Sequence, residues 1–255
     1  MTAVLETQNL SLQFGGVNAL SDLSVPIERG ALHAIIGPNG AGKTSFFNCL
    51  TGYYRPTSGV VRFEGTEITG LNAAKVAALG IRRTFQNIRV FPKMSVLENV
   101  LAGGHLRATS NLFAITFAGP RFRRTERQLR DEAMASLEFV GLVEQANHLA
   151  GDLPYGMRKR MELARVLIAQ PVVVLLDEPA AGVSSVERAE LSSVIRRVHE
   201  LGTCVVMIEH DVDLVMEIAS EVTVLDNGRV IASGRPQDVR TNPDVIRAYM
   251  GRQRQ

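Results

Sequence analysis

Short apolar runs divide this chain into recognisable elements. Three of them are almost continuous in aliphatic and β-branched residues and end abruptly at glycine or charged residues: 31–36, 172–176 and 203–208. Such runs predict strands that are buried on both faces, as in a parallel sheet. Helical patterns follow at 45–50, 95–101, 125–140 and 156–169. Asn227-Gly228 between two apolar segments predicts a hairpin turn. The chain therefore reads as an α/β protein.

The segment between the first strand and the helix after it matches the phosphate-binding pattern G-x-x-x-x-G-K-[ST]. Backbone N–H groups of such a loop converge on phosphate oxygens at the positive end of the helix. Lys43 adds a charge for the β- and γ-phosphates, and the Thr44 hydroxyl suits Mg²⁺. We expect a nucleoside triphosphate to contact Gly37, Pro38, Asn39, Gly40, Ala41, Gly42, Lys43, Thr44 and Ser45.

Charged residues end the other two apolar strands. Asp177 and Glu178 follow the second strand, and His210 follows the third. The carboxyl ends of parallel strands face the nucleotide in a phosphate-loop protein. We therefore expect Asp177 to hold Mg²⁺ opposite Thr44, Glu178 to reach the attacking water, and His210 to contact the γ-phosphate.

These motifs, together with Gln86 and a signature-like segment before Asp177, resemble those of the nucleotide-binding subunit of an ABC transporter. The resemblance covers essentially the whole chain and names ATP as the nucleotide. It implies that Phe14 stacks on adenine, that Gln86 senses and helps to hold Mg²⁺ and contacts the membrane partner, that Glu178 is the general base, and that His210 is the switch residue.

The resemblance also implies the architecture. We expect one ABC ATPase domain over 1–255: a phosphate-loop NTPase core with an N-terminal antiparallel β subdomain at 1–88 and 161–255, and an inserted helical subdomain with the signature segment at 89–160. No membrane-length apolar run is present among the 255 residues. The N-terminus lacks the features of a secretory signal, so we expect the chain to stay in the cytoplasm.

The signature is where the sequence departs from the family. Its L-S-G-G-Q is replaced by Leu153-Pro154-Tyr155-Gly156-Met157, and Pro154 supplies neither a hydroxyl nor an N–H. Ser184 stands where the family has aspartate. Leu153, Tyr155 and Gly156 remain candidates for contact with ATP on the opposite subunit. We hypothesise a heterodimer with a second, different ATPase subunit, in which one ATP site is strong and the other weakened.

Within the family, the chain is most similar to the ATP-binding subunits of branched-chain amino acid importers. Five segments carry this similarity: 14–16, 47–52, 83–86, 177–182 and 242–249. It implies two membrane permeases and an external solute-binding protein as partners, with this subunit peripheral on the cytoplasmic side of the bacterial inner membrane. The ATPase sequence does not identify the solute.

Two alternatives remain open. A lipopolysaccharide-type exporter ATPase shares Phe14-Gly15-Gly16 but would be expected to keep an intact signature. A soluble ABC ATPase acting on ribosomes or nucleic acid would normally carry two ATPase halves or a long coiled coil. The chain has one half, and its net charge of +2 gives no reason to expect nucleic acid as a partner.

Overall fold

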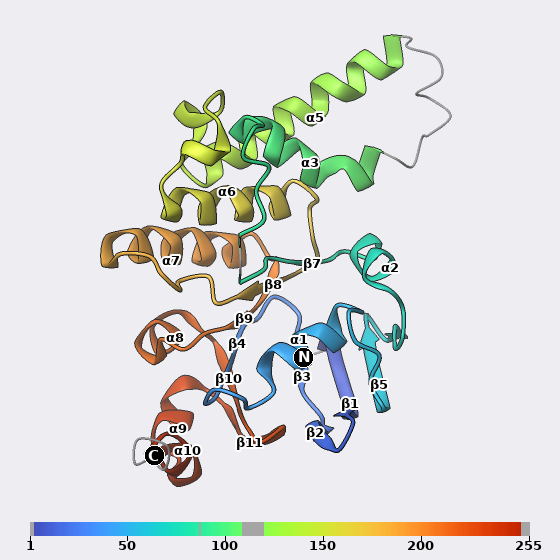
Figure 1. Ribbon diagram of the computed structural model, residues 1–255, viewed down its shortest axis with the longest axis vertical. Helices are drawn as coiled ribbons and strands as arrows, with labels where there is room; N and C mark the ends of the chain where they lie inside the picture. Colours follow the sequence, from blue (N-terminus) through green and yellow to red (C-terminus); the bar gives the residue numbers. More distant parts are fainter. Residues whose placement is uncertain (1–2, 87, 109–119, 251–255) are drawn as a thin grey trace. The chain divides into compact units, whose positions relative to one another are not determined.

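The computed structural model describes residues 3–86, 88–108 and 120–250. The chain forms two compact units, which are drawn in Figure 1. The first comprises residues 1–83, 172–180 and 195–255, and the second comprises residues 84–171 and 181–194. The expected mixed α/β fold is confirmed. The division into a core of 1–88 and 161–255 with a helical subdomain of 89–160 stays a prediction.

The first unit contains a sheet of six strands in the order β11-β10-β4-β9-β8-β7. All neighbours pair in parallel except β10 and β11. Its members are β4 (Leu32–Ile36), β7 (Ile81–Arg83), β8 (Val173–Asp177), β9 (Cys204–Ile208), β10 (Glu221–Asp226) and β11 (Arg229–Gly234). Every residue of β4, β8 and β9 is buried, which explains their unbroken apolar sequences.

A second, antiparallel sheet of five strands belongs to the same unit. Its strands are β1 (Ala3–Phe14), β2 (Val17–Leu23), β3 (Pro26–Glu28), β5 (Ser58–Phe63) and β6 (Thr66–Glu67). Helix α1 (Lys43–Leu50) places Phe46, Phe47 and Leu50 in a core that also takes side chains from both sheets. The remaining helices are α2 (Ala73–Ala78), α8 (Val212–Ile218), α9 (Pro236–Arg240) and α10 (Pro243–Met250).

The second unit is built around three helices that pack on one another: α3 (Val96–Ala108), α5 (Pro120–Phe139) and α6 (Tyr155–Leu167). Two short 3₁₀ turns, Val143–Gln145 and Ala150–Asp152, lie between α5 and α6. A Cβ on Gly103 would overlap the Arg165 carbonyl oxygen, so a glycine is needed where α3 meets α6. Helix α7 (Ser185–Glu200) has residues in both units.

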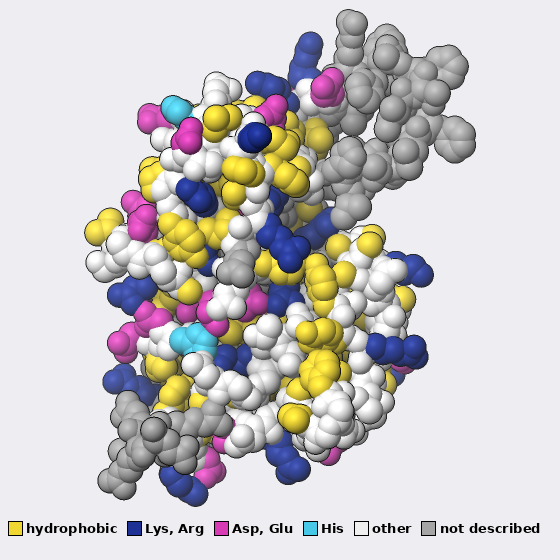
Figure 2. Space-filling view, in the orientation of Figure 1, with side chains coloured by type: hydrophobic (Ala, Val, Ile, Leu, Met, Phe, Trp, Pro, Cys, Tyr) yellow, Lys and Arg dark blue, Asp and Glu magenta, His cyan; other side chains and the backbone are white. Residues whose placement is uncertain are grey.

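A reciprocal cap fixes the start of α3. The Ser95 N–H donates to Glu98 Oε2 (2.7 Å), and the Glu98 N–H donates to Ser95 Oγ (3.1 Å). The buried Asn99 side chain bonds to both backbone groups of Phe91. Basic and acidic side chains are interspersed on the face shown in Figure 2, in keeping with the small net charge of +2.

A buried histidine lies in the central sheet. His33 on β4 is hydrogen-bonded through Nε2 to Thr223 Oγ1 (2.8 Å) on the neighbouring strand β10. Its Nδ1 lies 3.6 Å from the half-exposed Glu221 carboxylate. Burial lowers the pKa of His33 to about 4. The ring is therefore neutral in the folded protein at pH 5 to 6.

This histidine predicts a loss of stability in mild acid. The unfolded ring takes up a proton near pH 6.5, whereas the folded ring does so only near pH 4. The free energy of unfolding should therefore fall as pH drops through this interval, by up to about 3 kcal/mol. Urea unfolding from pH 7.5 to 4.5 should show a shallower acid-side loss for His33→Gln than for the wild type. Equal slopes for both proteins would contradict the assignment.

Candidate functional site

The carboxyl ends of β4, β8 and β9 form one edge of the parallel sheet. Ile35, Ile208 and Asp177 are paired across these three strands. The phosphate-binding loop, the acidic pair and His210 begin within two residues of that level. The structure therefore brings together the three segments that the sequence analysis singled out.

Glycines in the phosphate-binding loop are required by its backbone. Gly37, Gly40 and Gly42 have φ of 146°, 79° and 101°. A Cβ on Gly37 would overlap the Leu225 carbonyl oxygen, and one on Gly42 would lie 2.6 Å from the Ala19 carbonyl oxygen. The loop thus fits closely against neighbouring strands. Burial raises the pKa of Tyr249 on α10, and a hydrogen bond from the Gly37 backbone lowers it, so α10 also contacts the loop.

The start of α1 supplies the groups that the motif predicts. No side chain caps this helix, whose N-cap is Gly42, so its positive end is available to an anion. The Lys43 ammonium is buried and donates to the carbonyl oxygens of Gly37 (2.6 Å) and Pro38 (3.0 Å). Thr44 is exposed and Ser45 half-buried in the first turn. The loop fits a triphosphate.

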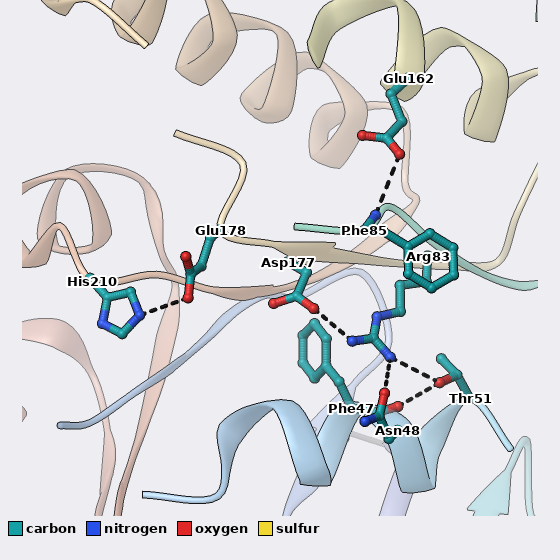
Figure 3. Close-up of polar contacts among 9 residues, drawn as sticks. All are labelled: Phe47, Asn48, Thr51, Arg83, Phe85, Glu162, Asp177, Glu178 and His210. Atoms are coloured by element: carbon teal, nitrogen blue, oxygen red, sulfur yellow. Dashed lines mark hydrogen bonds and ion pairs between the residues drawn. The ribbon is translucent and has the colours of Figure 1, made fainter. Parts of the chain in front are cut away.

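Asp177 lies at the end of β8 beside a buried arginine (Figure 3). Arg83 Nη2 donates to Asp177 Oδ2 at 2.6 Å, and the two side chains are only 5% and 4% exposed. Arg83 belongs to the segment 83–86, but its sequence position alone predicts no role for it. Arg83 comes close to Asp177 because the short strand β7 pairs in parallel with β8, a neighbour relation that the sequence does not indicate.

Glu178 faces His210 across the same edge, as Figure 3 shows. Glu178 Oε1 and His210 Nε2 lie 2.7 Å apart. The glutamate side chain is 14% exposed and the histidine 42%, so the pair is reachable from solvent. Glu178 has φ of 49°, the left-handed region that non-glycine residues rarely adopt. Its N–H donates to the Ile208 carbonyl (3.0 Å), which secures this turn at the strand end.

Glu209 is a buried carboxylate that the sequence analysis did not assign. Its Oε1 accepts the Ala180 N–H (2.8 Å) and its Oε2 accepts the His210 N–H (3.1 Å). Burial raises the pKa of Glu209, and these backbone donors oppose the rise. One side chain thereby joins the loop after β8 to the loop after β9.

Phe14 ends β1 and is 48% exposed. Its ring meets Tyr54 edge to face, with centroids 5.2 Å apart. An exposed aromatic pair of this kind offers a planar surface for a base. Tyr54 was not among the predicted contacts, and nothing in the motif pattern distinguishes it.

The other predicted residues lie in the second unit. Gln86 is exposed, and the Phe85 N–H beside it donates to Glu162 on α6 (3.5 Å; Figure 3). Burial raises the pKa of Glu162, and the charge of Arg165 opposes the rise. The segment with Gln86 is thus linked to the helix that begins at the altered signature.

Pro154 is the N-cap residue of α6, and no side chain caps the helix. Leu153 is buried, Tyr155 exposed and Gly156 buried. Arg158 donates to the carbonyl oxygens of Leu153 (2.7 Å) and Gly151 (2.9 Å). The altered segment is therefore held in a defined conformation by its own helix.

Glu187 on α7 also contacts this segment. Hydrogen bonds from the Ser184 backbone and hydroxyl, and then from the Gly156 backbone, lower the pKa of Glu187. Ser184 in turn accepts the Glu187 N–H, so the two form a reciprocal cap on α7. A carboxylate thus takes the Gly156 N–H at the start of α6.

Among residues 3–86, 88–108 and 120–250, no group of three or more His, Cys, Asp or Glu side chains is placed to hold a metal ion. Asp177 and Thr44 do fit Mg²⁺, which prefers one or two protein oxygen ligands together with phosphate and water. Over the same ranges, no helix has both the length and the apolar character that a membrane crossing needs.

Known proteins with similar sequences are ABC transporter subunits. The ABC transporter family model matches residues 20–181, and a model described as branched-chain amino acid ATP-binding cassette transporter matches residues 229–254. The high-affinity branched-chain amino acid transport ATP-binding protein BraF of Pseudomonas aeruginosa is 44% identical over 97% of this chain and 98% of its own. LivG of Escherichia coli K12, also named as a high-affinity branched-chain amino acid transport ATP-binding protein, is 41% identical over 97% of this chain and 98% of its own.

A solved structure agrees with these matches. The ADP conformation of the ATP-binding cassette MJ1267 has a TM-score of 0.86 and 31% identity, and the match covers 98% of this chain and 100% of that one. The chain therefore belongs to the ABC transporter family, as an ATP-binding and ATP-hydrolysing subunit.

Proposed function

We propose that this chain energises the uptake of branched-chain or related amino acids by an ABC importer. The observation that carries the proposal is the similarity to BraF and LivG, whose names state branched-chain amino acid transport and which match almost the full length. The exporter and soluble alternatives are not favoured, because these relatives are named as amino acid transport proteins and not as lipopolysaccharide exporters or as proteins that act on ribosomes or nucleic acid.

ATP is the substrate in this proposal. Backbone N–H groups from Gly40 to Ser45 surround the β-phosphate, and the Lys43 ammonium exchanges its loop carbonyls for phosphate oxygens. Phe14 stacks on adenine, with Tyr54 supporting its ring. Thr44 and Asp177 would hold Mg²⁺, and the bound ion would neutralise charge that develops between the β- and γ-phosphates. The family resemblance also predicts Gln86 as a ligand.

Glu178 acts as the general base. Its carboxylate takes the proton of the water that attacks the γ-phosphorus. The bond from this phosphorus to the β–γ bridging oxygen breaks, and ADP leaves with the electron pair while the N-terminal end of α1 stabilises the phosphate oxygens. His210 Nε2 lies 2.7 Å from Glu178 Oε1 and orients that carboxylate, and the imidazole ring also contacts the γ-phosphate. The hydrogen bonds that Glu209 accepts from Ala180 and His210 keep the loops after β8 and β9 at the spacing that this contact requires.

The partner is a second, different ATPase subunit. A dimer completes each ATP site with the signature of the opposite subunit, and this chain contributes one with Pro154 and with Glu187 bound at Gly156. A carboxylate there opposes an arriving phosphate. The site with Lys43 and Glu178 is then the strong one, and the site on the partner is the weak one.

Coupling runs through Gln86 to two membrane permeases, and an external binding protein delivers the solute. Because ATP binds the closed dimer more tightly than the open one, binding shifts the conformational population and hydrolysis resets it. The subunit itself is peripheral, on the cytoplasmic side of the bacterial inner membrane.

Neutralising the base should separate hydrolysis from binding. In the complex with partner ATPase and permeases, we expect Glu178→Gln to lower ATP turnover by about 10²- to 10⁴-fold, the usual contribution of a general base. The affinity for a fluorescent ATP analogue should stay close to wild type. Loss of nucleotide binding would show that Glu178 supports the site rather than acting as its base.

The two ATP sites should contribute unequally. Glu178→Gln should remove most of the turnover, whereas the same change of the partner's base should leave most of it. ATPase assays of the purified complex, with each subunit altered in turn, measure this directly. Comparable losses from both changes, or full activity of this chain alone, would instead support two equivalent sites.

Transport should depend on the same base. Proteoliposomes that contain the complete complex should take up labelled leucine, isoleucine or valine when ATP and the loaded binding protein are supplied, and Glu178→Gln should abolish uptake. If the complex hydrolysed ATP but took up none of the three amino acids, the assignment as an ATPase would stand and the assignment of the solute would be wrong.

A further inference from the structure

Arg83 joins three elements of the first unit at one point. Its Nη2 donates to Asp177 Oδ2 (2.6 Å), and its Nη1 donates to Asn48 Oδ1 (2.6 Å) and lies 3.3 Å from Thr51 Oγ1 (Figure 3). The guanidinium carbon lies 5.5 Å from the centre of the Phe47 ring. The two terminal nitrogens are thus divided between the acid on β8 and helix α1.

A cation in this position is costly unless its partners are fixed. Arg83 is 5% exposed and cannot lose its proton, so burial must be offset by the carboxylate, the amide and hydroxyl oxygens and the aromatic face. The planar fork admits few arrangements of these partners. The network therefore sets where Asp177 stands relative to α1.

The contacts on α1 fall on a particular face of the helix. Asn48 and Thr51 follow Thr44 by four and seven residues, a spacing that places all three on one side. Thr51 is the C-cap residue and Thr44 is in the first turn. Arg83 consequently holds Asp177 against the same side of α1 that presents the Thr44 hydroxyl.

We infer that Arg83 is a positioning residue for the magnesium site: it fixes the separation between the Asp177 carboxylate and the Thr44 hydroxyl before Mg²⁺ and ATP bind. This inference rests on the proposed function, in which these two groups hold Mg²⁺. The opposite role, in which the guanidinium competes with the metal for Asp177, predicts the opposite change in metal affinity.

Metal affinity can be measured apart from nucleotide affinity. Mn²⁺ serves as the probe, with free Mn²⁺ counted by electron paramagnetic resonance in the presence of the full chain and ATP. Fluorescence of an ATP analogue in EDTA reports nucleotide binding alone. We expect Arg83→Lys, which keeps the charge but not the fork, to weaken Mn²⁺ binding about 10- to 100-fold, as is typical when a group that orients a ligand is lost.

Asn48→Ala is a second test in case the Arg83 variant fails to fold. It leaves the ion pair between Arg83 and Asp177 intact and removes only the contact between Arg83 and the Asn48 side chain on α1. It should weaken Mn²⁺ binding in the same direction. The matched control is Arg82→Lys, the same substitution one position earlier on β7, where side chains point to the other face. All three variants should keep the nucleotide affinity in EDTA.

Each other outcome is decisive. Unchanged Mn²⁺ affinity in Asn48→Ala and Arg83→Lys overturns the inference, and tighter binding assigns Arg83 as a competitor. An equal loss in Arg82→Lys, or a loss of nucleotide binding in EDTA, would show general disturbance of the site and likewise overturn it. If the wild type binds ATP but no Mn²⁺, the magnesium assignment itself fails, and this inference fails with it.

Discussion

Parallel hydrogen bonding of β4, β8 and β9 is the constraint on which the site depends. Ile35, Ile208 and Asp177 are in register, so all three strands end at the same edge of the sheet. Parallel neighbours require long crossover connections, so residues far apart in sequence are collected there. Because the strands are wholly buried, polar chemistry can begin only where they end.

Buried charges beneath that edge are supported in two different ways. Asp177 is paired with a cation, Arg83, whereas Glu209 accepts hydrogen bonds from the backbone N–H groups of Ala180 and His210. Burial accordingly raises the pKa of Glu209. The first arrangement fixes a carboxylate against α1, and the second fixes two loops against each other. In the proposed function both would restrict the edge before ATP binds, which would lower the reorganisation that hydrolysis requires.

Much of the fold could be predicted from the sequence. The strands expected at 31–36, 172–176 and 203–208 are β4, β8 and β9 within a residue. Their apolar runs match strands that are buried on both faces. The helix expected at 95–101 continues to Ala108 in α3. Gly103 and Gly104 would ordinarily weaken a helix, but here a glycine is needed for the approach to α6, a tertiary reason that local patterns do not contain.

Only part of the candidate site could be singled out from the sequence, and the roles of its residues stay predictions. Its motif residues were found because they stand in a fixed spacing or directly after a strand. Arg83, Glu209 and Glu187 were missed because a charge acquires its partner through strand order and helix packing. That β7, only three residues long, pairs with β8 is what brings Arg83 to Asp177. A sequence pattern records the type of residue but not the neighbour it will meet.

In the altered signature, the hydrogen-bonding residues around the segment matter more than its match to the family motif. Pro154 removes a hydroxyl and an N–H, yet α6 starts normally, since Arg158 holds the preceding carbonyls and Glu187 accepts the Gly156 N–H. A carboxylate is stabilised at the N-terminus of a helix for the same reason that a phosphate is. Glu187 and a phosphate would therefore draw on the same donor. The proposed weakness of one ATP site then follows from competition between two anions at an ordered helix end, and not from loss of structure in the segment.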